Sequence, residues 1–188
     1  MEINTKGNLE LYFKKLGQLG INTEKLSSEY GELLENATFS NMSDNGLAYD
    51  GSLIKTIMYK LTPYAIRINE LYPESIRVDK NTLVKVCLLH HIAKCVRFVK
   101  NDNEWEIKNR GMVYKYNKEN PPIRNGLHSL IIAQNCGITF TAEEADAMTI
   151  NDRDLSDDQA RYHCTMLASI VRQANEMVYI DAVNTNKK

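Results

Sequence analysis

The stretch that most constrains the fold is residues 81–94, which read NTLVKVCLLHHIAK. Its apolar residues cover most of the circumference of a helix, a pattern typical of a helix buried at the centre of a helical protein. His90 and His91 lie inside this stretch, and successive residues on a helix point about 100° apart. We therefore expect one central helix over Asn81–Lys94, in which at most one of the two imidazoles faces a given site.

Length and composition limit the class of protein. The chain has 188 residues, of which 43% are hydrophobic, and this is enough for one domain with a proper core over residues 1–188. The net charge of −1 gives no general attraction for nucleic acid, so we do not expect a nucleic-acid partner. No apolar run reaches the roughly 18 residues that a membrane span needs, so no membrane partner is expected either.

The four cysteines predict reduced thiols rather than a disulfide framework. They are far apart in the sequence and form no C-x-x-C pair, which is typical of buried thiols in a reducing compartment. We therefore expect a cytoplasmic protein. The cysteines are Cys87, Cys95, Cys136 and Cys164.

The remaining elements follow from apolar spacing and from helix-start and helix-stop residues. A mainly α-helical bundle with a small β-hairpin insertion is the expected fold. The hairpin covers about residues 96–116, with strands at 96–99 and 104–107 around residues 101–103 and a third strand at 112–116. The expected helices cover residues 8–19, 23–36, 52–71, 123–136 and 156–182, and a further helix starts at the capping box formed by Thr141 and Glu144. Pro63 should kink the helix 52–71. Residues 37–51 are expected to form a loop and residues 184–188 a frayed tail.

Three short motifs resemble the HD-domain phosphohydrolases. LLHHIAK, residues 88–94, resembles the family signature L-L-H-D-[IL]-x-K, with His91 in place of the aspartate. YDGSLIKT, residues 49–56, resembles Y-[ED]-G-G-L-x-x-H, with Thr56 in place of the histidine. PIRNG, residues 122–126, resembles P-x-x-H-G, with Asn125 in place of the histidine. The resemblance implies a helical bundle in which these positions hold one or two divalent metals that activate water against a phosphate ester.

Two further positions of the family pattern are also changed. A later histidine of the family matches about Asn151, and the aspartate of its Q-A-D motif matches Asn175. Neutral amides and hydroxyls lack the charge and the ligand strength of carboxylates and imidazoles. We therefore expect no metal, no cofactor and no catalytic residue in a vestigial site made of Thr56, His90, His91, Asn125, Asn151 and Asn175.

Other kinds of site have weaker support. Cys87, His91 and Cys95 are spaced four residues apart, but the outer two lie about 12 Å apart along a helix, too far to share one zinc ion. The sequence contains no nucleophile elbow, P-loop or G-x-G-x-x-G motif. Glu143 and Glu144 are explained by helix capping. The acidic residues Asp152, Asp154, Asp157 and Asp158 lack the glycine and the terminal glutamate of an EF-hand loop.

These observations predict a catalytically inactive HD-like protein that serves as a structural, assembly or protein-interaction component. Its partners would be other protein subunits in an oligomeric assembly. Frequent Asn, Lys, Ile and Tyr are typical of AT-rich coding, and this bias favours a component of a phage or virus particle. The protein would then be located in the virion. The alternatives are a metal-dependent phosphohydrolase acting on nucleotides, with Asp50 or Asp152 assisting His90 and His91, and a nucleotide-binding module without hydrolysis.

Overall fold

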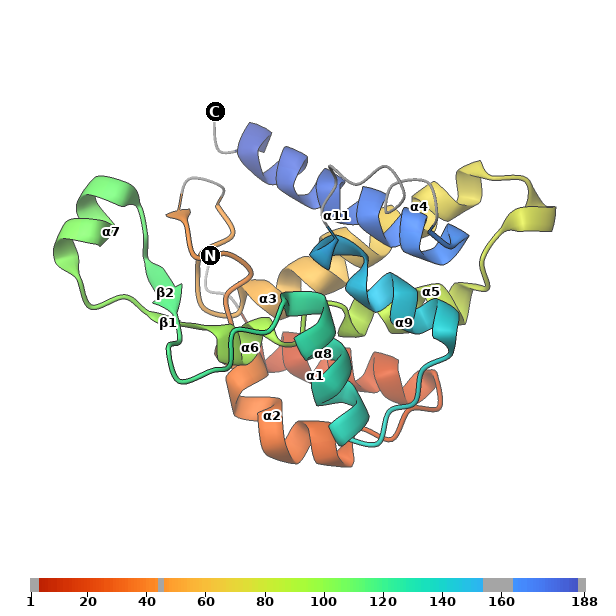
Figure 1. Cartoon of the computed structure of the whole chain (residues 1–188), viewed down its shortest axis with the longest axis horizontal. Coiled ribbons are helices and arrows are strands. Elements are labelled where there is room, and N and C mark those ends of the chain that lie inside the picture. Colours follow the sequence, from red (N-terminus) through yellow and green to blue (C-terminus); the bar gives the residue numbers. More distant parts are fainter. Residues whose placement is uncertain (1–3, 44–45, 154–163, 186–188) are drawn as a thin grey trace.

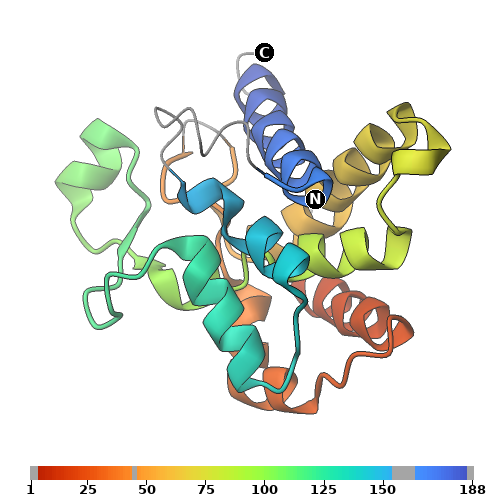
Figure 2. The same ribbon diagram turned by 45° about the vertical axis from the view of Figure 1, so that its right-hand side comes forward.

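The computed structural model describes residues 4–43, 46–153 and 164–185 (Figure 1). It is mainly helical with one two-stranded antiparallel sheet, as the sequence predicts. The first two helices, α1 (Thr5–Gln18) and α2 (Glu24–Asn36), pack against each other. Figures 1 and 2 show α5 (Lys80–Leu89) in the middle of the molecule, between α1 on one side and α4 (Thr62–Leu71) and α11 (Met166–Thr185) on the other.

The predicted helix 52–71 contains an irregular turn. It consists of α3 (Ser52–Thr56), a π-helical turn η2 (Ile57–Leu61) and α4, followed by a short 3-10 turn η3 (Glu74–Ile76). Pro63 has no N–H to donate to the preceding turn, and a π-turn is one way to accommodate such a break. The Thr62 amide and hydroxyl both bond to the Ile57 carbonyl, the hydroxyl at 2.8 Å. The irregularity therefore lies just before Pro63 rather than at it.

The central helix ends earlier than predicted. α5 stops at Leu89, residues 90–93 form turns, and a separate short helix α6 (Lys94–Arg97) follows. The Leu88 carbonyl accepts a hydrogen bond from the Tyr12 hydroxyl at 3.1 Å, and the Ala93 amide donates to Ser129 Oγ at 3.1 Å. The side chains of Tyr12 and Ser129 thus bond to backbone groups that a continuous helix would use. The prediction of one helix over Asn81–Lys94 is wrong at its C-terminal end.

The β-hairpin exists, but its loop contains a helix. β1 (Phe98–Lys100) pairs with β2 (Tyr114–Tyr116) in an antiparallel register, with Phe98 opposite Tyr116. The predicted strand at 104–107 is wrong, because Glu104–Arg110 forms α7. The Asn103 side chain accepts from the Glu106 amide at 3.2 Å, and Gly111 ends the helix in the left-handed region with φ 62°. Figures 1 and 2 show α7 projecting from the body of the molecule.

The C-terminal half adds α8 (Asn125–Asn135), α9 (Ala142–Thr149), the 3-10 turn η4 (Ile150–Asp152) and α11. The predicted capping box at Thr141 and Glu144 is confirmed. The start of the predicted helix 156–182 lies outside the described residues. Asp154, Asp157 and Asp158 also lie outside them. Cys164 and Thr165 are not helical, so a single helix over 156–182 is wrong. α11 continues through Thr185, so the first two residues of the predicted frayed tail are helical, and residues 186–188 lie outside the described residues.

One hydrophobic cluster connects the helices from Tyr12 in α1 to Ala182 in α11. Leu88 and Leu89 are fully buried in it. All four cysteines are free thiols, and only Cys164 is partly exposed. No described helix is both long and apolar enough to cross a membrane.

Candidate functional site

The structure brings five of the six vestigial positions together. They come from different elements, yet their side chains meet in one cluster, in which His90, His91 and Asn175 are buried, Asn125 is half-buried and Asn151 is exposed; we call it the imidazole–amide cluster. Its hydrogen bonds link His91 to Asn125 and Asn175, and His90 to Asn151. The two imidazole rings are also in edge contact, with centroids 4.4 Å apart. The cluster consists of His90 and His91 after α5, Asn125 at the start of α8, Asn151 in η4 and Asn175 in α11.

Two amides occupy both ring nitrogens of His91. Its Nε2 atom lies 2.8 Å from Asn175 Oδ1, and its Nδ1 atom lies 3.0 Å from Asn125 Nδ2. Because an amide oxygen only accepts, Nε2 carries the hydrogen, and Nδ1 accepts from the Asn125 amide. An imidazolium would present two donors and could not accept that bond. This arrangement therefore holds His91 in its neutral form.

His90 has the opposite tautomer. Its Nε2 atom lies 2.8 Å from Asn151 Nδ2 and accepts from it, which places the hydrogen on Nδ1. Nδ1 forms no hydrogen bond of acceptable geometry with a described residue. Burial and, to a smaller extent, the Lys94 charge together lower the pKa of His90 to about 3, and the Met148 backbone opposes this shift. Both rings belong to one cluster, so the prediction that at most one imidazole faces a given site is wrong. It assumed a continuous helix through both residues, whereas α5 ends at Leu89.

Lys94 is a buried cation beside the cluster. Its Nζ atom donates to the Phe39 carbonyl at 2.7 Å and to the Tyr179 hydroxyl at 3.2 Å, and it lies 3.6 Å from the centre of the Phe39 ring. The Phe39 ring packs edge-on against His91, with centroids 5.0 Å apart. Burial, together with the Arg97 charge, lowers the pKa of Lys94 to about 7. Burial and the Lys94 charge also lower the pKa of His91 well below its usual value.

Lys94 is the functional residue that sequence reasoning missed. It belongs to the LLHHIAK motif, but the motif assigns it no role. The available signal was a lysine directly after a stretch rich in apolar residues, where its side chain could be buried. Lysine is almost never buried unless it is paired.

The sixth vestigial position and the two proposed assisting acids lie outside the hydrogen bonds of the cluster. Thr56 is buried at the end of α3. Asp50 accepts from the Tyr114 hydroxyl at 2.7 Å and from Lys100 at 2.7 Å, near the hairpin. The Asp152 carboxylate accepts from the Gly126 and Leu127 amides at 2.9 and 2.7 Å, and so caps α8.

The Asp152 cap and a glycine fix Asn125 in place. An ideal Cβ at Gly126 would lie 2.2 Å from the Met148 carbonyl oxygen, so a side chain there would push α8 away from α9. Gly126 therefore lets the start of α8 approach α9. Asn125 reaches His91 because of this close approach.

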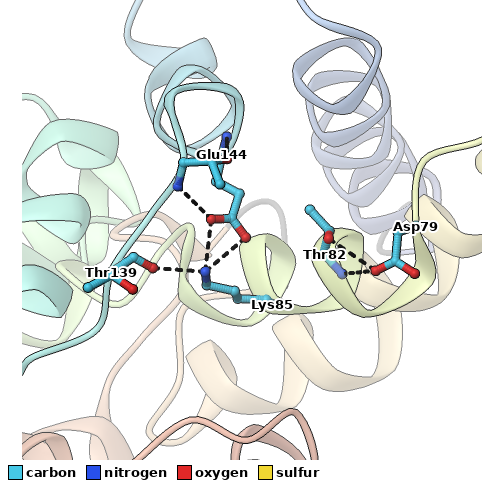
Figure 3. Close-up of polar contacts among 6 residues, drawn as sticks. Asp79, Thr82, Lys85, Thr139 and Glu144 are labelled. Atoms are coloured by element: carbon cyan, nitrogen blue, oxygen red, sulfur yellow. Dashed lines mark hydrogen bonds and ion pairs between the residues drawn. The ribbon is translucent and has the colours of Figure 1, made fainter.

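A partly buried ion pair joins α9 to α5. Lys85 in α5 contacts both Glu144 carboxylate oxygens at 2.8 Å and donates to the Thr139 carbonyl at 2.8 Å (Figure 3). Asp79 caps the N-terminus of α5 by accepting from the Thr82 amide at 2.9 Å (Figure 3). The cap is local to α5, whereas the Lys85–Glu144 ion pair joins α5 to α9, the helix that leads into η4 and Asn151.

The cluster does not fit a divalent metal. It contains two imidazoles and three amides, and no carboxylate or thiolate belongs to its hydrogen bonds. Within residues 4–43, 46–153 and 164–185, no three His, Cys, Asp or Glu side chains are grouped to hold a metal ion. Transition metals prefer imidazole, thiolate and carboxylate ligands, and a buried lysine beside the site repels a cation.

Comparisons with protein-family models, curated proteins and solved structures found no match for this chain. The resemblance to HD-domain phosphohydrolases therefore rests on the motif residues quoted above. The meeting of five of these positions in one cluster is a separate observation, since the motifs are scattered over residues 90–175 of the sequence.

Proposed function

We propose that this chain is an HD-like helical protein without catalytic activity, which serves as a protein-interaction or assembly component. The observation that supports the HD-like assignment is the convergence of five motif positions on one hydrogen-bonded cluster. A chance resemblance among short motifs gives no reason for residues 84 positions apart to contact each other.

The chemistry of the cluster supports the loss of activity. Metal-assisted hydrolysis needs a cation to lower the pKa of a bound water. Here the His91 nitrogens are both used by amides, and Lys94 supplies a competing positive charge. Around His91 the cluster resembles a hydrogen-bonded core, because both ring nitrogens are paired as buried polar groups normally are. His90 Nδ1 and Asn125 Oδ1 have no hydrogen-bond partner among the described residues.

An apolar groove between α4 and α11 supports the interaction role. It has a volume of about 530 Å³ and is lined mainly by apolar side chains from the two helices. Leu71 is 84% exposed and Ile180 is 61% exposed. Contiguous exposed apolar surface of this kind marks protein-interaction sites in many proteins. The phage or virus setting depends on the composition alone.

The proposal is tested by activity and by oligomeric state. Protein purified without a chelator is expected to release no phosphate from nucleotides with added manganese, and to form oligomers in light-scattering measurements. Leu71→Ser with Ile180→Ser should shift those oligomers towards monomer, because the groove loses apolar area. Leu127→Ser, at a 44% exposed position of α8, is the matched control and should leave the oligomer unchanged. Metal-dependent turnover, or a wild-type protein that stays monomeric, would contradict the proposal.

A further inference from the structure

A second cavity lies next to the hairpin and is lined by positive charge. Its volume is about 510 Å³, within the range of small-molecule sites. Arg97, Lys118, Arg124 and His128 line it, and among the described residues no aspartate or glutamate does. This is a local exception in a chain whose net charge is −1. No member of the imidazole–amide cluster lines the cavity.

The cavity wall is fixed by hydrogen bonds between α6 and the segment that joins β2 to α8. The Asn117 amide donates to the Arg97 carbonyl at 2.8 Å, and Asn117 Nδ2 donates to the Val96 carbonyl at 3.3 Å. The Asn120 side chain donates to the same Val96 carbonyl. These bonds hold the wall in place without a ligand, so that binding would require little reorganisation.

The arginines of the cavity are oriented without being neutralised. Arg97 donates from Nη1 to the Ile123 carbonyl at 3.1 Å, and its guanidinium lies 5.4 Å from the centre of the Tyr116 ring. Arg124 donates to the backbone carbonyl of Asp152. Within the described parts of the chain, neither arginine nor Lys118 forms an ion pair with a carboxylate. The Asp152 carboxylate is engaged by the α8 amides instead.

We propose that this cavity binds a small anion with two or more phosphoryl groups. Three permanent positive charges around one cavity match a ligand of several negative charges better than a monocarboxylate. Arginine presents a planar set of N–H donors that suits phosphate oxygens, and lysine adds a point charge. The exposed face of Tyr116, 57% accessible, offers an apolar surface for an organic group attached to the phosphates. This proposal is independent of the assignment of the imidazole–amide cluster.

Inorganic pyrophosphate is the first probe, and ATP at equal ionic strength is the second. Calorimetric titration of the full chain in phosphate-free buffer is expected to show saturable binding at one site. Lys118→Gln and Arg124→Gln should each weaken pyrophosphate binding by about tenfold or more, as expected for the loss of a charge-assisted hydrogen bond. Lys108→Gln removes one exposed positive charge from α7, outside the cavity, and should change binding by less than about twofold.

Several outcomes would overturn the proposal. The first is the absence of saturable pyrophosphate and ATP binding by wild-type protein. The second is an equal loss of affinity in Lys118→Gln and Lys108→Gln, which would mean that only the overall charge matters. The third is tighter binding of a single-stranded oligonucleotide than of pyrophosphate with equal sensitivity to Lys108→Gln, which would indicate an extended surface rather than this cavity. Lys118 is exposed, so its variant remains informative if Arg124→Gln fails to fold.

Discussion

His91 Nε2 lies 2.8 Å from Asn175 Oδ1, although 84 positions separate the two residues in the chain. The contact joins the turn after the central helix to the last helix. It also fixes the tautomer of His91, because the amide oxygen accepts a hydrogen from Nε2. This pair is therefore a sensitive place to test whether the cluster is a structural core.

The first prediction concerns the loss of this bond. Asn175→Leu keeps the size of the side chain but leaves the buried Nε2–H of His91 without an acceptor. We expect the free energy of unfolding to fall by about 1–3 kcal/mol, measured by urea denaturation. Asn135→Leu, at an exposed position of α8, should change stability by less than about 0.5 kcal/mol. Equal effects of the two variants would show that the bond contributes nothing.

The second prediction concerns the protonation of the histidines. Nitrogen NMR of the imidazoles should show opposite neutral tautomers, with hydrogen on Nδ1 of His90 and on Nε2 of His91. The folded-state pKa of each ring is lowered, to about 3 for His90. The unfolded chain therefore binds more protons below its usual histidine pKa of about 6.5, and stability is lost as the pH falls below that value. A ring that becomes charged near pH 6 in the folded protein would contradict the tautomer assignment.

The third prediction concerns Lys94, whose folded-state pKa is lowered to about 7. Above that pH the folded protein releases a proton that the unfolded chain retains, so stability rises with pH by at most about 1.4 kcal/mol per unit. Lys94→Met should remove this rise between about pH 7 and pH 8, where cysteines of the unfolded chain, with a usual pKa of about 8.5, are mostly protonated. Lys108→Met, exposed on α7, should keep the wild-type slope. Parallel slopes for wild type and Lys94→Met would show that Lys94 stays charged.

The fourth prediction rebuilds a metal site. His91→Asp, Asn125→His and Asn175→Asp place two carboxylates and a further imidazole beside His90, and Lys94→Met removes the repelling charge. Without metal the two carboxylates repel each other, so this variant should be less stable than wild type. Manganese or nickel at 100 times its Kd should restore about 2.7 kcal/mol. Thr56 is left unchanged because it lies outside the hydrogen bonds of the cluster.

The metal experiment has two contradicting outcomes. A rebuilt variant that ignores both metals would show that these positions do not converge on one ligand shell. A wild-type protein that manganese stabilises to the same extent would show that the natural cluster already binds metal. Thermal denaturation with and without metal distinguishes the two cases, since ligands that bind only the folded state raise the unfolding temperature.

Apolar spacing and capping residues were enough to predict most helices. Thr141 and Glu144 form the predicted box, because capping depends on residues three positions apart and needs no tertiary information. The segment 104–107 was predicted wrongly because charged and apolar residues alternate there. Asn103 and Gly111 nevertheless provide a cap at each end of α7, and local capping prevailed over the alternating pattern.

The site could be predicted in its residues but not in its chemistry. Family-like motifs named six positions, and hydrogen bonds or ring contact join five of them: His90, His91, Asn125, Asn151 and Asn175. Thr56, the sixth, takes no part in these bonds. The role of Lys94 depends on Phe39 and Tyr179, which lie 55 and 85 positions away in the sequence. No local pattern encodes contacts over such separations.

The early end of the central helix has a consequence for how the chain folds. Tyr12 and Ser129 impose the end by taking the Leu88 carbonyl and the Ala93 amide. A peptide of residues 80–97 lacks both partners, so the marginal helix that it forms in water should not end at Leu89. The turn that carries both histidines is then a late event, formed only when the two ends of a long chain segment dock on the same helix. Assembly of the interior, rather than any local instruction, determines where His90 and His91 point.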